Sequence, residues 1–109
     1  MKVLYMIIVI ARFPIINAER VKDFVKWFEW SNHLLQKIPG LISRRLLLAK
    51  NGNYVAIVEF DSMNSFVAMH QTDIHKNIHE TAATIFIGKP LPEIYEVIGT
   101  ALEKNKYEI

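Results

Sequence analysis

Two histidines spaced four residues apart are the side chains of this sequence most suited to chemistry. His75 and His79 would lie on one face of a helix, with their Cβ atoms about 6 Å apart. A neutral imidazole can accept a proton as a general base or ligate haem iron. No HExxH glutamate lies between them and no third ligand is apparent, so we expect no metal site built from protein side chains alone. The alternative is that both are partly exposed helix residues, as we also expect for His70 near a helix break.

Arginines on the predicted strands could hold an acidic group of a ligand. Arg12 closes the first predicted strand, and Arg44 and Arg45 lie on the second. An isolated charge inside a sheet is costly, so we expect Arg44 to pair with Glu59 on the neighbouring strand. Arg12 or Arg45 could then hold a phenolate or a propionate through its planar guanidinium. The alternative is that these two arginines only reach solvent.

Four further side chains are candidates for the wall of a ligand pocket. Tyr54 and Phe60 are expected on the same side of the sheet as Arg45, which makes that side the better candidate for the pocket. Trp30 and Met69 lie on the predicted helices, where a large apolar side chain could form another wall. The alternative for Trp30 is packing in the core or between subunits, which is the more common use of such residues.

Composition excludes several other classes of protein. The chain has 109 residues, of which 51% are hydrophobic and 22% charged, so it is expected to fold as one domain. Its net charge of +2 is too balanced to predict nucleic-acid binding. The absence of cysteine excludes disulfides, thiolate catalysis and Cys-ligated zinc. The longest apolar run, residues 3–11, is far short of the roughly 20 residues of a membrane helix, and we expect a cytoplasmic protein.

The elements that must position these candidates can be predicted from periodicity. Apolar residues three or four apart predict amphipathic helices at 18–37 and, with a break near Thr72, at 61–86. Runs of β-branched and aromatic residues predict strands at 3–13, 41–49, 54–60 and 93–98. The order β-α-β-β-α-β is typical of a ferredoxin-like α+β subunit, in which both helices cover one face of an antiparallel sheet.

The hairpin between the second and third predicted strands decides which side chains share a face. Asn51-Gly52 indicates a type I′ turn, in which both central residues need positive φ. With that turn at the tip, the predicted cross-strand pairs are Lys50–Asn53, Leu48–Val55, Leu46–Ile57 and Arg44–Glu59. Both faces of the sheet are then mostly apolar, and the helices cover only one. We therefore expect a second copy of the chain to cover the other face, giving a homodimer.

Four stretches, in order along the chain, carry a resemblance to a known family. They are IIVIARF, KIPGLISRRLL, YVAIVEFDSMNSFVAMHQTDIHK and GKPLPEIYEVI. Together they resemble the antibiotic biosynthesis monooxygenase family of dimeric α+β barrels. The most diagnostic part is the Phe-Asp-Ser motif that begins at Phe60, with the histidine-bearing stretch after it. Family members usually have Trp at Phe60 and commonly have His at Met69 and Ile74, whereas this sequence keeps only the histidine at His75.

The resemblance implies a small pocket in each subunit, between the sheet and the helices. In several members that pocket oxygenates electron-rich aromatics such as quinols without metal or flavin. The protein there supplies orientation, a proton acceptor and a dry site. We accordingly expect His75 to be the base and Arg12 or Arg45 to orient the substrate. The resemblance runs from about residue 6 to 98, so we assign the ferredoxin-fold domain to residues 1–98 and a C-terminal tail to 99–109.

One subgroup of the family binds and degrades haem through a histidine on the second helix, and a gapless count places His79 there. Its helix Trp falls on Met69 and its first-strand Asn falls on Ala11, so two residues typical of that subgroup are missing. Three functions stay open. We rank a cofactor-free monooxygenase acting on a small aromatic or quinol-like substrate first. A haem-binding or haem-degrading protein and a non-catalytic dimeric module that binds a hydrophobic small molecule are the alternatives.

Overall fold

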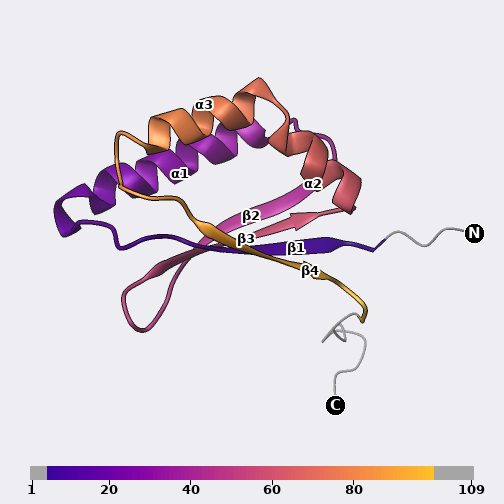
Figure 1. Ribbon diagram of the computed structural model, residues 1–109, viewed down its shortest axis with the longest axis horizontal. Coiled ribbons are helices and arrows are strands. Elements are labelled where there is room, and N and C mark those ends of the chain that lie inside the picture. The colour runs from indigo at the N-terminus through magenta and orange to yellow at the C-terminus, as the bar shows by residue number, and fades with distance from the viewer. Residues whose placement is uncertain (1–4, 100–109) are drawn as a thin grey trace, which may run out of the picture.

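The computed structural model describes residues 5–99 and has the predicted alternation of strands and helices (Figure 1). Its strands and helices are β1 (Ile7–Arg12), the 3-10 turn η1 (Ala18–Arg20), α1 (Val21–Leu35), β2 (Leu41–Leu48), β3 (Tyr54–Phe60), α2 (Met63–His70), α3 (Asp73–Ala82) and β4 (Leu91–Glu96). The predicted tail, apart from Gly99, lies outside the described residues. None of the helices described is both long enough and apolar enough to cross a membrane.

The four strands form one antiparallel sheet in the order β2-β3-β1-β4. Helices α1 and α3 lie together over one face, with α2 toward one end of it, and the opposite face has no covering element in residues 5–99 (Figure 1). This arrangement confirms the predicted ferredoxin-like α+β fold. Strand β4 begins two residues earlier than predicted and includes Pro92, which an edge strand tolerates because its outer side needs no N–H donor.

Two hydroxyl caps divide the second helical region where the sequence predicted a break. The Ser62 side chain accepts a hydrogen bond from Ser65 N–H (3.2 Å) and starts α2, and the Thr72 side chain accepts one from His75 N–H (3.2 Å) and starts α3. Such caps satisfy amide groups that a helix start leaves without partners. The second cap places His75 in the first turn of α3, directly after the end of α2.

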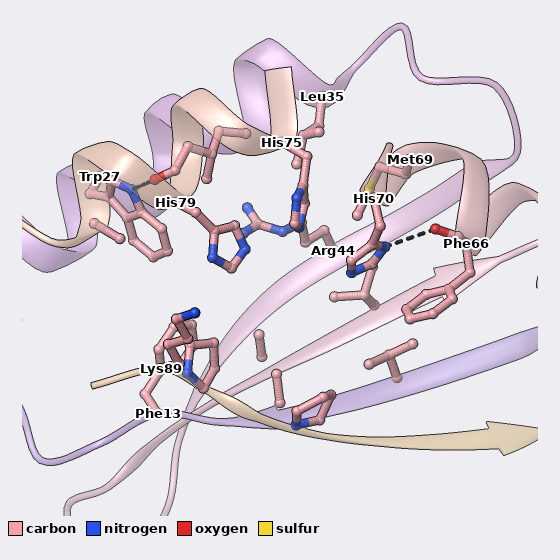
Figure 2. A pocket seen from close by; sticks show the side chains of 18 of the residues that line it. Phe13, Trp27, Leu35, Arg44, Phe66, Met69, His70, His75, His79 and Lys89 are labelled. Atoms are coloured by element: carbon pink, nitrogen blue, oxygen red, sulfur yellow. Dashed lines mark hydrogen bonds between the residues drawn. The ribbon is translucent and has the colours of Figure 1, made fainter. Parts of the chain in front are cut away.

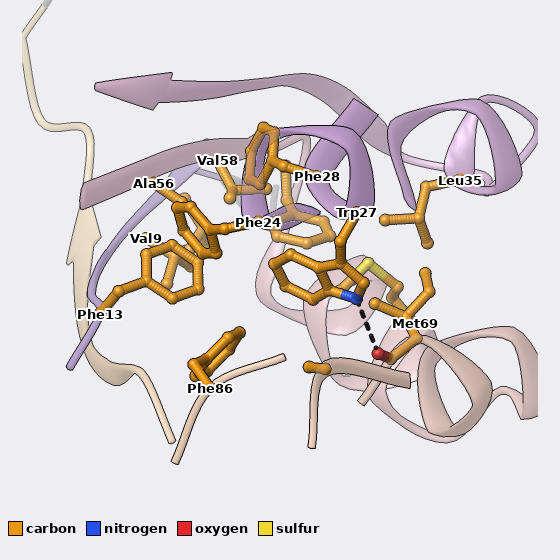
Figure 3. Close-up of a cluster of buried hydrophobic side chains, with 14 residues drawn as sticks. Val9, Phe13, Phe24, Trp27, Phe28, Leu35, Ala56, Val58, Met69 and Phe86 are labelled. Carbon is orange, nitrogen blue, oxygen red and sulfur yellow. Dashed lines mark hydrogen bonds between the residues drawn. The ribbon is translucent and has the colours of Figure 1, made fainter. Parts of the chain in front are cut away.

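The core lies between the helices and the sheet (Figure 3). Phe24 on α1 and Phe60 on β3 are its most deeply buried large side chains, with exposed fractions of 0% and 1%. Phe24 contacts Phe13, Trp27 and Phe86, with ring centroids 5.0–5.9 Å apart. This aromatic cluster fixes α1 over the sheet at one end of the molecule.

The tip of the β2–β3 hairpin is not the predicted type I′ turn. Ala49 N–H donates to Asn53 O (2.8 Å) and Gly52 N–H donates to Ala49 O (2.9 Å), so the loop has three residues, of which Gly52 alone has positive φ, 89°. These are the features of a type I turn followed by a left-handed glycine. The additional loop residue shifts the register by one, and the predicted cross-strand pairs are wrong.

The register shift exchanges the faces expected for the two arginines, because neighbouring side chains point to opposite sides of a strand. Arg44 lies opposite Val58 on the helix-covered face. Arg45 lies on the other face, where its Nη2 is 3.4 Å from Glu59 Oε1. The predicted Arg44–Glu59 pair is therefore wrong, and Tyr54 and Phe60 share a face with Arg44 rather than with Arg45.

The second face of the sheet, called the open face below, is mostly apolar as predicted. On β1 its side chains alternate with the buried Ile7 and Val9, and on β3 with the buried Ala56 and Val58. Its apolar residues are Ile8, Ile10, Leu47, Val55, Ile57, Leu91 and Tyr95. Leu47 is 44% exposed and Leu91 72% exposed, so this face leaves large apolar side chains in contact with water.

Candidate functional site

A cavity of about 380 Å³ lies between the helix-covered face of the sheet and the helices. Small and aromatic side chains form its sheet side: Val9, Ala11, Ala56, Val58 and Phe60. The opposite side comes from α1, α2 and α3, and the segment from Phe86 to Pro92 closes one end (Figure 2). The volume is that of a small-molecule site.

Three histidines form a row along the helical wall of the cavity. The ring centroids of His70 and His75 are 4.3 Å apart, and those of His75 and His79 are 4.2 Å apart. Phe66 continues the row, with its centroid 4.2 Å from that of His70. All four residues line the cavity, and in Figure 2 the three imidazoles lie on its helical side. The break at Thr72 makes this possible, because it brings the end of α2 beside the start of α3.

Two histidines of the row, His75 and His79, are held in their neutral forms. Burial, with a further contribution from the neighbouring His79, lowers the pKa of His75 to about 4. Burial and the nearby charges of His70 and Lys89 also lower the pKa of His79. His70 Nδ1 donates to the carbonyl oxygen of Phe66 (2.8 Å), which leaves Nε2 as an acceptor in the neutral ring. Near pH 7, His75 and His79 therefore offer proton acceptors and not positive charge.

Arg44 supplies a positive charge beside this row. Its Nη1 donates to Ser31 Oγ (2.5 Å) and Asn32 Oδ1 (2.7 Å), and its Cζ lies 4.1 Å from the centre of the Phe28 ring. Burial lowers the pKa of Arg44 to about 10, so the guanidinium stays protonated at pH 7. The neighbouring helix α1 thus fixes the side chain through two polar contacts and one aromatic contact.

Trp27 ties the helix that positions Arg44 to the helix that carries the histidines. Its indole Nε1–H donates to the carbonyl oxygen of Ile78 on α3 (3.0 Å), and its ring lines the cavity. The bond crosses from α1 to α3 in the interior (Figure 3). A rigid wall of this kind keeps catalytic or binding groups in place.

The structure brings half of the predicted site residues together. His75, His79, Phe60 and Met69 all line the cavity. Their predicted chemical roles stay predictions, since position alone does not assign them.

The other four predicted site residues lie outside this cavity. Arg12 forms an ion pair with Glu93 at the end of β1, and Arg45 pairs with Glu59 on the open face. Trp30 borders a shallow groove on the outer side of α1. Tyr54 packs on Phe24, with ring centroids 5.1 Å apart.

Sequence reasoning missed Arg44 and Lys89 as cavity residues and gave His70 no role in the site. The error in the β2–β3 register explains why Arg44 was missed. The predicted ion pair with Glu59 gave its charge a protein partner, so no ligand was considered for it. The sequence could have indicated His70, because it lies just before the predicted break near Thr72. A break of this kind brings side chains of the two flanking helices together. Nothing in the sequence around Lys89 signals the cavity.

No cluster of three or more His, Cys, Asp or Glu side chains within residues 5–99 could hold a metal ion. A haem group would need an imidazole ligand and apolar walls, and His79 with the lining described above provides both. Met69 and Ala11, at the positions where the haem-degrading subgroup has Trp and Asn, also line the cavity. The residues therefore fit haem binding better than they fit the ring distortion expected of haem degradation.

The fold and this cavity define a class of protein, the ferredoxin-like α+β proteins with a small-molecule site between sheet and helices. The model of the antibiotic biosynthesis monooxygenase family matches residues 6–81, and the chain belongs to this family. The resemblance seen in the sequence is thus confirmed. No curated protein matches the chain.

Solved structures agree on the fold. A protein of Caulobacter crescentus CB15, described as a candidate antibiotic biosynthesis monooxygenase, has a TM-score of 0.78 at 21% identity, covering 88% of this chain and 92% of that one. A variant of SnoaB, a cofactor-independent oxygenase from Streptomyces nogalater, has a TM-score of 0.75 at 15% identity, covering 90% and 98%. A conserved protein of Methanosarcina mazei Go1 has a TM-score of 0.74 at 17% identity, covering 84% and 92%.

Proposed function

We propose that this chain is a monooxygenase that oxygenates a small electron-rich aromatic or quinol-like substrate in the cavity, without metal or flavin. The observation that carries the proposal is a largely apolar cavity in which the neutral imidazoles of His75 and His79 can accept a proton. Family membership supports the reaction type. The name of SnoaB, a cofactor-independent oxygenase with the same fold, supports chemistry that uses only substrate and oxygen.

For an anthrone-like phenol, the reaction balances without an added reductant. A ring CH₂ group flanked by phenolic rings loses a proton, and the resulting carbanion transfers electrons to O₂. One oxygen atom becomes a carbonyl on that carbon, and the other leaves as water with the two hydrogens of the CH₂ group. The substrate supplies all four electrons. The protein must accept a proton, orient the substrate and exclude bulk water.

His75 is the proposed base. It lines the cavity, and its lowered pKa keeps the imidazole unprotonated at neutral pH. The same low pKa makes the protonated ring a strong acid, so it would readily give the proton back to a reduced-oxygen species later in the reaction. It lies between His70 and His79, whose rings are its nearest imidazole neighbours and could receive the proton.

A homodimer through the open face is part of the proposal. The apolar side chains on that face would otherwise form a large exposed patch on a single chain. A second sheet packed on it would bury them at the spacing of about 10 Å that is usual for stacked sheets.

Oxygen uptake with a panel of quinols and anthrone-like phenols tests the proposal. We expect uptake above the substrate's autoxidation rate, lowered about 100-fold or more in His75→Ala, because general-base catalysis contributes about 10²- to 10⁴-fold. His33→Ala is the matched control, since His33 is an exposed histidine in the last turn of α1. Equal rates in both variants would contradict the role of His75. No uptake above autoxidation with any substrate would contradict the proposed enzyme.

Haem binding is the second candidate, favoured by the position of His79 in the cavity wall. His79 would be the axial ligand, and bound haem would supply oxygen activation. Titration of the protein with haemin separates the candidates. A saturable Soret band at one haem per chain that disappears in His79→Ala would support it. A flat titration would exclude it. Tight binding of a quinol without turnover would instead support the non-catalytic module.

A further inference from the structure

Every ionisable side chain that lines the cavity is basic. The five are Arg44, Lys89 and the three histidines His70, His75 and His79, and no Asp or Glu is among the lining residues. An apolar ligand alone would not need this bias, because a neutral hydrophobic site requires no charge. His75 and His79 are neutral near pH 7, so the positive charge of the cavity comes from Arg44 and Lys89, and it favours a ligand that brings negative charge.

Arg44 contributes most to this bias, because its charge has no counter-charge among residues 5–99. All its contacts within residues 5–99 are to neutral groups: the Ser31 hydroxyl, the Asn32 side-chain carbonyl and the Phe28 ring. No carboxylate of this part of the chain lies within 4.0 Å of its guanidinium. Leaving a largely buried charge unpaired is unfavourable, and an anion bound in the cavity would remove that cost.

The hydrogen-bonding geometry of Arg44 shows what kind of anion would fit. Both protein acceptors are on Nη1. The Nε and Nη2 groups have no acceptor among the described residues, and together they form a planar edge with two parallel donors. A carboxylate matches that edge with two hydrogen bonds, which a single phenol oxygen cannot do.

We propose that the ligand of this cavity is a planar aromatic acid, with its carboxylate on the Nε–Nη2 edge of Arg44 and its ring among the apolar lining residues. Phe60 on the sheet side and Trp27 and Phe66 on the helical side provide aromatic contact for such a ring. This inference rests on the proposed function only in taking the same cavity as the substrate site, and it narrows the substrate class to ring systems that carry an acid group.

A matched pair of ligands tests this on the unmodified full-length protein. 2-Naphthoate and 2-naphthylmethanol have the same ring system and differ in charge. Isothermal titration calorimetry at pH 7 should show naphthoate binding once per chain and at least about tenfold more tightly than the alcohol, as expected for hydrogen bonds to a charged group. Equal affinities, or no binding of naphthoate at 1 mM, would overturn the inference.

Variants then assign the preference to Arg44. Arg44→Gln should reduce the naphthoate preference to within about twofold, and Arg44→Lys should keep part of it, because lysine keeps the charge and loses the planar edge. Lys22→Gln removes the same charge from an exposed site on α1 and should leave the preference intact. A preference that survives in folded Arg44→Gln would contradict the assignment, and circular dichroism checks the fold.

The proposed acid site and the proposed monooxygenase can be contradicted independently of each other. A naphthoate preference without oxygen uptake on any aromatic substrate would overturn the proposed monooxygenase and leave the acid site standing. Oxygen uptake on neutral quinols with no preference for the acid would overturn the acid site and leave the monooxygenase standing.

Discussion

The two faces of the sheet carry similar residue types in different surroundings. Arg44 lies under the helices and touches only neutral groups, whereas its sequence neighbour Arg45 lies on the open face beside Glu59. The exposed pair contributes little to stability, because water screens both charges. The enclosed charge is costly unless something binds to it. If the proposed acid ligand binds Arg44, the two arginines differ in what balances their charge: a ligand for Arg44 and a surface carboxylate for Arg45.

The apolar residues of the two faces differ in the same way. On β3, Val58 and Phe60 are buried by the helices of the same chain, and Val55 and Ile57 alternate with them on the open face. Burial of the first pair is complete in a single chain. Burial of the second pair is the role of the partner chain in the proposed dimer. The helix-covered face should therefore determine the stability of the fold, and the open face should determine association.

The largest expected difference is between two truncations on β3. Phe60→Ala should lower the free energy of unfolding by about 3–5 kcal/mol, because it opens a cavity in the core. Ile57→Ala should cost about 1 kcal/mol in dilute solution and more as the protein concentration rises, because its full burial needs a partner. Urea unfolding at two concentrations 100-fold apart measures both. A concentration-independent loss in Ile57→Ala would contradict the proposed dimer.

The next prediction tests association directly. Ile10→Glu places a charge in the middle of the open face, and two such charges would meet across a packed pair of sheets. We expect the dissociation constant to rise at least about 100-fold, which is about 2.7 kcal/mol. Light scattering at micromolar protein should then give the chain mass of 12.7 kDa instead of about twice that value. Ile15→Glu, at an exposed position off the sheet, should leave the dimer mass unchanged; a monomeric wild-type protein would contradict the interface.

The element order could be predicted from the sequence because periodicity and capping are local. Ser62 and Thr72 cap α2 and α3, and the break between these helices falls where the sequence predicted it. The register of the β2–β3 hairpin could not be predicted, since Asn51-Gly52 is compatible with both a two-residue and a three-residue loop. The choice between them depends on how both strands pack.

The uncertain register explains why Arg44 was missed as a site residue. His75, His79 and Met69 lie on helices, where the face of a residue follows from its spacing, and all three line the cavity. Arg44 lies on β2, where a shift of one residue reverses the face, and it was assigned to the wrong side. Side chains that enter the cavity from loops, such as Lys89, had no periodic signal at all.

Replacing Arg44 or Arg45 by methionine should have a smaller effect on the free energy of unfolding. Arg44→Met keeps an unbranched side chain of similar length and removes the unpaired charge, so the free energy of unfolding should stay the same or rise by about 1 kcal/mol. Ser31 keeps a partner, because its hydroxyl donates to Phe28 O (2.7 Å). Arg45→Met should change stability by less than about 0.5 kcal/mol, as expected for an exposed pair. A loss above about 2 kcal/mol in Arg44→Met would show that the charge stabilises the fold.

The smallest expected effect is a pH dependence of the free energy of unfolding that comes from the cavity histidines. The pKa of His75 is lowered to about 4 in the folded chain, chiefly by burial and next by His79, and the unfolded chain has the ordinary value near 6.5. Between these values the unfolded state binds more protons, so the free energy of unfolding should fall as the pH drops from about 7 toward 4. His75 faces His70, His79 and Arg44, and none of these supplies a negative charge to oppose the trend.

Comparing variants isolates this contribution from the protonation of carboxylates elsewhere. Between pH 7 and pH 5, wild-type protein should lose of order 1 kcal/mol more than His75→Gln, a figure that allows for the partial exposure of the ring. The loss of stability between pH 7 and pH 5 should be smaller in His75→Gln but should not disappear, because the pKa of His79 is also lowered. His33→Gln, on the exposed side of α1, should keep the wild-type slope. If the free energy of unfolding has the same pH dependence in His75→Gln and wild type, His75 titrates as it does in water. That result would contradict the neutral state assigned to His75.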